Sequence, residues 1–165
     1  MIKYFLIFLF LVSCSNMPKK PAPEKLFPFG TYHHNISFEV KAKEIAMSFT
    51  GINQWTKERF VVVGLGPMDM TMIKYTENKE NYTKDLYINK ELIPIDEDRA
   101  LKLMSLMKDM YSWDRSICED KKCRDTFWGI PINIELNDQY QVSKIMVSQG
   151  GVVVNVDVTS YEKAL

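Results

Sequence analysis

The cysteine pair Cys118 and Cys123 has the residue types and the spacing for covalent chemistry. In an oxidising compartment, two cysteines this close in sequence can close a small disulfide loop. Two alternatives stay open, namely free thiols and a metal site. A metal site needs further ligands, and the two histidines of the chain, His33 and His34, are far away in sequence. Because neighbours on a strand point to opposite faces, these two histidines would not chelate one ion.

No other set of side chains predicts catalysis, so we expect that the protein is not an enzyme and uses no cofactor. The segment Gly64-Leu65-Gly66 lacks the third glycine of a dinucleotide loop and lies between predicted strands. The carboxylates Asp96, Glu97 and Asp98 fit the start of a helix, where negative charge is favourable. The 21 basic and 21 acidic residues balance, and no basic stripe with interleaved aromatic residues appears, so nucleic acid is not expected as a partner.

The N-terminus predicts an export signal. Lys3 precedes an apolar run of nine residues, 4–12, which is too short to cross a bilayer because a spanning helix needs about 20. The residues that close it, Leu11-Val12-Ser13-Cys14, resemble the lipobox of bacterial lipoproteins. This resemblance implies that the signal is cut before Cys14 and that the thiol carries diacylglycerol. The alternative is an ordinary signal peptide with a chance cysteine.

These features predict three regions: a signal peptide over residues 1–13, a lipidated N-terminus with a proline-rich tether over 14–28, and one folded domain over 29–165. Two or more acyl chains hold a protein on a membrane stably. In the enterobacterial pattern an aspartate after the cysteine retains lipoproteins in the inner membrane. Ser15 stands there, which favours the periplasmic face of the outer membrane.

The folded domain predicts a mainly β (α+β) architecture. Apolar or β-branched residues repeat in short segments typical of an antiparallel meander or barrel, at 36–40, 45–49, 59–63, 70–75, 86–88, 132–136, 142–147 and 152–158. One helix is expected after Asp96. Its apolar face is expected to contain Ala100, Leu103, Met104, Met107 and Met110 or Tyr111. A polar loop with the cysteine pair is expected to follow.

The segment Gly66-Pro67-Met68-Asp69 predicts a tight turn with Met68 at its tip. Turn tips usually carry polar residues, whereas Leu65, Met68 and Met70 gather around this one. Exposed apolar groups rimmed by polar ones mark contact surfaces. We therefore expect a membrane-contact loop, and the alternative is a tip that folds back on the core.

Two segments, 59–73 and 138–151, resemble the outer-membrane lipoprotein receptor LolB and a related group of uncharacterised bacterial lipoproteins. In the first segment, Met68 stands where the family has an exposed leucine after a proline. Residues 127–131 and the helix after Asp96 fall in matching order.

The resemblance implies a curved antiparallel sheet, an incomplete barrel with one main helix as its lid. In that family the hollow takes acyl chains from the soluble carrier LolA, and the loop leucine helps to deliver the cargo. For this chain we expect a charged loop with Cys118 and Cys123 in place of the second helical lid. We expect a monomer that binds or transfers lipid or lipoprotein acyl chains in the periplasm, with a LolA-like carrier as its partner. The alternative is a structural or accessory lipoprotein without a lipid cavity that binds protein partners.

Overall fold

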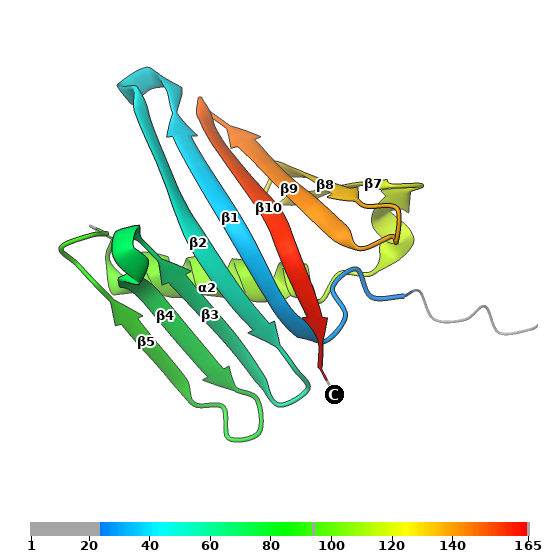
Figure 1. Cartoon of the computed structure of the whole chain (residues 1–165), viewed down its shortest axis with the longest axis horizontal. Helices are drawn as coiled ribbons and strands as arrows, with labels where there is room; N and C mark the ends of the chain where they lie inside the picture. Colours follow the sequence, from blue (N-terminus) through cyan, green and yellow to red (C-terminus); the bar gives the residue numbers. More distant parts are fainter. Residues whose placement is uncertain (1–23, 94, 165) are drawn as a thin grey trace, which may run out of the picture.

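The computed structural model describes residues 24–93 and 95–164, so the predicted signal peptide and Cys14 lie outside the described residues. Figure 1 shows one sheet and one α-helix, α2 (Glu97–Tyr111). The strands are β1 (Gly30–Val40), β2 (Ile45–Trp55), β3 (Arg59–Leu65), β4 (Thr71–Asn78), β5 (Lys84–Ile88), β6 (Cys118–Glu119), β7 (Lys122–Phe127), β8 (Ile130–Leu136), β9 (Val142–Gln149) and β10 (Val152–Lys163). Three short 3-10 helices connect them: η1 (Lys41–Lys43), η2 (Pro67–Asp69) and η3 (Arg115–Ile117). None of the helices in the described residues is long and apolar enough to cross a membrane.

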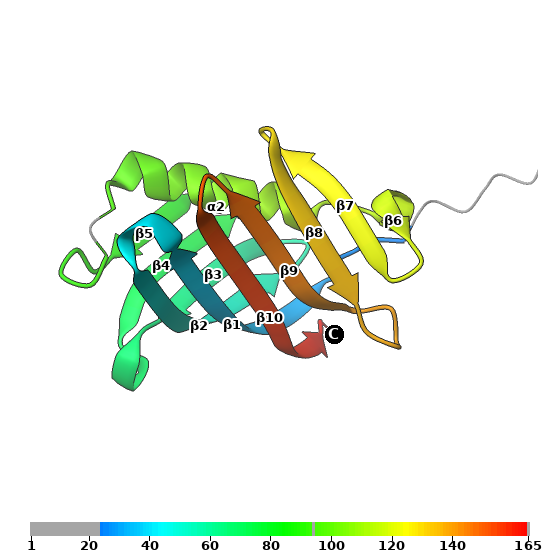
Figure 2. The ribbon, with the colours of Figure 1, turned by 90° about the horizontal axis from the view of Figure 1, so that it is seen from above.

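All ten strands are antiparallel to their neighbours, in the order β5-β4-β3-β2-β1-β10-β9-β8-β7-β6. The first and last long strands, β1 and β10, therefore meet in the middle, and the edges β5 and β6 do not pair with each other. The sheet is strongly curved, with α2 lying across its concave side (Figure 2). The prediction of a mainly β fold with a curved, unclosed antiparallel sheet and one main helix is confirmed.

The concave face is apolar where it meets the helix because the strands alternate. In β3, Phe60 and Val62 are buried while their neighbours are more exposed. Phe60 packs against Tyr111, which lies in the last turn of α2. The ring centroid of Tyr111 is 5.6 Å from that of Phe60 and 4.6 Å from that of Phe27. Tyr32 and Trp55 complete this aromatic cluster, at 5.4 and 6.0 Å from Tyr111.

The helix begins as predicted. The side chain of Asp96 accepts a hydrogen bond from the backbone nitrogen of Arg99, at 2.9 Å. Ala100, Met104 and Tyr111 are buried, but the prediction for Leu103 was wrong, because 44% of this residue is exposed. The sheet contacts only a narrow stripe of the helix, and Leu103 lies outside it.

The folded domain begins earlier than the sequence predicted. Leu26 and Phe27, assigned to the tether, are fully buried in the core. The backbone nitrogen of Leu26 donates to the carbonyl oxygen of Trp113 at 3.0 Å, and Lys25 forms an isolated bridge with Asp114. Two apolar residues between prolines give no periodicity, so only the tertiary contact identifies them as core.

The prediction of a polar loop around the cysteine pair was also wrong, because these residues form β6 and β7. Half of the residues in β7 are charged, so its pattern resembles that of a loop. Only Cys123 of this strand is fully buried, and the strand is held by its pairing with β8 and β6. A hairpin therefore stands where a charged loop was expected.

A partly buried ion pair attaches α2 to β4. Nζ of Lys108 lies 2.6 Å from Oε1 of Glu77, and the Tyr75 hydroxyl donates to Oε2 of Glu77 at 2.9 Å. Burial opposes ionisation of the carboxyl group, but the hydrogen bonds from Lys108 and Tyr75 and the charges of Lys108 and Lys84 outweigh it. They hold the pKa of Glu77 below its usual value.

We predict that Glu77→Gln lowers the free energy of unfolding at pH 7 by about 1.5–3 kcal/mol, because it removes a charged partner of Lys108. A group whose pKa is lowered by folding stabilises the protein above its unfolded pKa, here the usual 4.5, and this stabilisation is lost as the pH falls through the lowered value. Urea unfolding at pH 7 and pH 3 should therefore show a difference that shrinks in acid. Glu58→Gln, in the exposed β2–β3 turn, is the control. An equal loss at both pH values would contradict the electrostatic role.

Candidate functional site

The strands β1, β2 and β10 extend beyond α2 at the end of the sheet where η1 connects β1 to β2 (Figure 1). We call this the β1–β2 end, and the concave face continues there past the helix. Tyr32 and His34 of β1 face the core, so alternation places Ile36 and Phe38 on the same face. The register between β1 and β2 is unbroken from residue 30 to residue 40. The cross-strand partners that share this face are Phe49 and Met47 on β2, and Val156 and Val154 on β10.

We call these six residues the open apolar face: Ile36, Phe38, Met47, Phe49, Val154 and Val156. Each of them is partly exposed, and Met47 reaches 53%. Further down the same strands, side chains on this face are covered by the aromatic cluster. An apolar surface that the fold leaves uncovered indicates a binding surface.

Gly51 marks the boundary between the closed core and the open apolar face. It pairs with His34 across the β1–β2 ladder and is buried. A Cβ at this position would lie 3.0 Å from Cδ1 of Ile36 and 3.7 Å from Cβ of His34. The missing side chain therefore allows Ile36 to lie against the sheet.

Below this boundary, three polar side chains are buried together. Nε2 of His34 lies 3.1 Å from both the Tyr111 hydroxyl and Nδ2 of Asn53, and Nδ2 of Asn53 also donates to the Tyr111 hydroxyl at 2.9 Å. The imidazole of His34, the amide of Asn53 and the hydroxyl of Tyr111 thus form one buried polar cluster.

The other ring nitrogen of His34 is Nδ1. That atom is buried and has no hydrogen-bond partner among the residues that the structure describes. Burial, and next the charge of His33, lower the pKa of His34 to about 4, so the ring is neutral at pH 7. Sequence reasoning considered His34 only as a metal ligand. Its place two residues after Tyr32 on one strand was the signal for a core position.

The loop around η2 is the second candidate contact surface. Met68 is 88% exposed at its tip, and Met70 is also exposed, whereas Leu65 is partly buried on the outer face of β3. Met68 has a φ of 55° and Asp69 one of 56°, in the left-handed region. Two backbone hydrogen bonds hold this conformation: Gly66 donates to Met70 at 2.9 Å, and Met70 donates to Pro67 at 3.3 Å. The loop leaves β3 at Leu65, whose cross-strand partner on β2 is Thr50.

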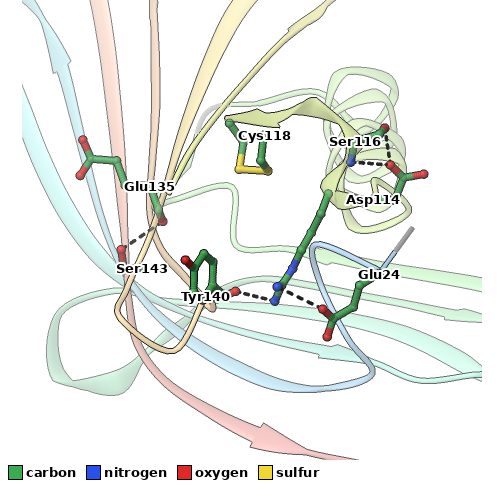
Figure 3. Close-up of a disulfide and its surroundings, with 9 residues drawn as sticks. Glu24, Asp114, Ser116, Cys118, Glu135, Tyr140 and Ser143 are labelled. Carbon is green, nitrogen blue, oxygen red and sulfur yellow. Dashed lines mark hydrogen bonds and ion pairs between the residues drawn. A yellow bond between two sulfur atoms is a disulfide. The ribbon is translucent and has the colours of Figure 1, made fainter. Parts of the chain in front are cut away.

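Cys118 and Cys123 form a disulfide between the paired residues of β6 and β7, with a Cα–Cα distance of 3.9 Å (Figure 3). Nearby, Arg115 in η3 forms an ion pair with Glu24 at 3.1 Å and donates to the carbonyl oxygen of Tyr140 at 2.6 Å. These contacts connect the start of the folded domain to η3 and to the β8–β9 turn.

The structure thus places the predicted site residues in separate regions. Met68 lies in η2 and Met70 directly follows it, Cys118 and Cys123 lie at the far edge of the sheet, and Cys14 is outside the described residues. Sequence reasoning missed the open apolar face, although the alternation that defines it was visible. The chain matches no protein-family model and no curated protein.

The buried imidazole predicts a specific pH dependence. Folding lowers the pKa of His34 from 6.5 to about 4, so the stabilisation is full above pH 6.5 and is lost as the pH falls towards 4. The loss approaches about 1.4 kcal/mol for each pH unit in this window. His34→Phe should therefore gain stability relative to the natural chain between pH 6.5 and pH 4, measured by denaturant unfolding. His33→Phe, on the opposite face of β1, should keep most of the original slope. Parallel pH profiles for the His34 variant and the natural chain would refute this assignment.

Proposed function

We propose that this protein is a lipid-anchored protein of the outer membrane whose half-barrel binds or transfers lipid or lipoprotein acyl chains. The observation that carries the proposal is the open apolar face. Six partly exposed apolar side chains gather there on three central strands, at the end of the sheet that α2 leaves uncovered.

The size and chemistry of this face suit an acyl chain. From Ile36 to Phe38 the face extends about 7 Å along β1, and it extends about 10 Å across the three strands, which is room for a segment of an acyl chain. All six of its side chains are apolar, and Met47 can adapt its shape to different ligands. Apolar concave surfaces of this kind are the usual sites for small ligands in proteins.

The resemblance to LolB supports the same proposal. The lipobox-like sequence before Cys14 supplies a membrane anchor, and the exposed Met68 occupies the position of the family's exposed leucine. On this proposal the anchor holds the half-barrel beside the bilayer, a LolA-like carrier supplies the acyl chain, and the η2 loop contacts the membrane that receives it.

A second candidate is an accessory lipoprotein that binds protein partners and has no lipid cavity. The filled core beneath α2 favours it, because the aromatic cluster around Tyr111 occupies the closed half of the barrel. The two candidates differ in whether the open apolar face takes up a chain.

Met47→Glu tests this difference. A charge on the open apolar face should weaken binding of a fluorescent fatty-acid analogue at least tenfold. The melting temperature should change little, because the side chain is half exposed. Ser48→Glu is the matched control, since it adds the same charge to the next residue, on the opposite face of β2. The measurement uses the chain from Glu24 onward, titrated by fluorescence. Equal affinities for the two variants, or no binding by the natural chain, would favour the accessory protein.

Met68→Glu tests the membrane contact of the η2 loop. We expect severalfold weaker binding to phospholipid vesicles, because burying a methionine side chain contributes about 1.5–3 kcal/mol and a carboxylate would be desolvated instead. The melting temperature should stay within about 2 °C, since an exposed surface substitution costs little. Met68→Leu should bind like the natural chain. Unchanged vesicle binding by Met68→Glu would eliminate this contact.

A further inference from the structure

The turn between β7 and β8 carries an exposed tryptophan. Only Trp128 and Gly129 connect the two strands, with φ values of 48° and 76°. A two-residue turn with both φ values positive normally contains Asn-Gly, because these residues tolerate left-handed backbone. Trp128 is instead a bulky aromatic residue in that conformation, and 71% of it is exposed. Hairpin formation alone does not account for a tryptophan here.

A row of aromatic side chains connects this turn to the start of the folded domain. The ring centroids of Trp128 and Phe127 are 5.5 Å apart, and those of Phe127 and Trp113 are 6.5 Å apart. The carbonyl oxygen of Trp113 accepts the backbone hydrogen bond of Leu26. A continuous row of contacts thus runs from Trp128 to Trp113, the residue that holds Leu26 at the start of the folded domain.

The length of the chain from Cys14 limits how far this region can be from the bilayer. Glu24 follows Cys14 by ten residues, which span at most about 35 Å when fully extended. Tryptophan has an apolar ring system and one N–H donor, and it prefers the interface between lipid chains and headgroups. The bilayer to which the protein is tethered is thus within reach of this exposed side chain and has the chemistry that suits it.

We propose that Trp128 inserts into the interfacial layer of the bilayer that holds the Cys14 anchor, as a second contact that orients the half-barrel. This inference rests on the lipid anchor of the proposed function and is independent of acyl-chain binding. It is also distinct from the η2 contact. In Figure 2 the β7–β8 turn lies beyond α2, and η2 lies on the opposite side of the molecule.

The test uses the full lipidated protein in vesicles of phosphatidylethanolamine and phosphatidylglycerol, with brominated acyl chains as fluorescence quenchers. Trp128→Asn creates the preferred Asn-Gly turn, so it removes the ring while keeping the hairpin. The control is Tyr82→Asn. Tyr82 is another exposed aromatic residue with positive φ, in the β4–β5 turn, where it is 83% exposed.

We expect quenching in the natural protein and in Tyr82→Asn, and its loss in Trp128→Asn, because the other tryptophans, Trp55 and Trp113, pack against the core. Equal quenching in Trp128→Asn and the natural protein, or no quenching in either, would overturn the proposal. An unmodified Cys14, seen by mass spectrometry of the N-terminal peptide, would overturn it together with the anchor. Loss of fatty-acid binding with quenching intact would refute only the proposed acyl-chain function.

Discussion

The packing of Tyr111 against the concave face is the interaction on which the rest of this structure depends. Its ring is surrounded by aromatic side chains from the N-terminal segment and from β1 to β3, and its hydroxyl contacts Asn53 and His34. The last turn of α2 is therefore fixed at one end of the barrel. A helix of 15 residues is about 22 Å long, whereas strands of 11–12 residues span about 36–40 Å. A helix fixed across the sheet at this point leaves the β1–β2 end uncovered.

Apolar packing holds the helix on the sheet, and two polar interactions specify its position there. Lys108 reaches Glu77 on β4, and the buried cluster of His34, Asn53 and Tyr111 joins the helix to β1 and β2. Apolar packing alone would tolerate a sliding helix, whereas a displaced carboxylate or imidazole would lose its partners in a water-poor environment. Nδ1 of His34, which has no hydrogen-bond partner among the residues that the structure describes, lies near the boundary between the core and the open apolar face. The core thus ends in a polar cluster, and the open apolar face begins with the next residues on the same face of β1 and β2.

Two of the most exposed apolar side chains, Met68 and Trp128, occur on connections and share a backbone signature. Met68 and Trp128 both adopt positive φ and are largely exposed. A left-handed residue other than glycine costs about 1–3 kcal/mol, and such strain concentrates at functional positions. Neither residue helps to bury the core, so neither is explained by folding. Connections can carry such groups because the sheet beneath them is held by long ladders of hydrogen bonds.

The sequence alone determined the features that depend on neighbouring residues. Alternating apolar residues predicted most of the strands, Asp96 predicted the start of the helix, and the Gly66–Asp69 segment predicted an exposed methionine tip. Only the tertiary structure decided which apolar residues are covered. It buried Leu26 and Phe27, exposed Leu103, paired a charged segment into β7, and placed His34 against Tyr111, 77 residues away. The reason is physical: alternation specifies which face of a strand a side chain occupies, but coverage of that face depends on where a distant helix packs. The open apolar face exists only because Tyr111 fixes α2 at the other end of the same strands.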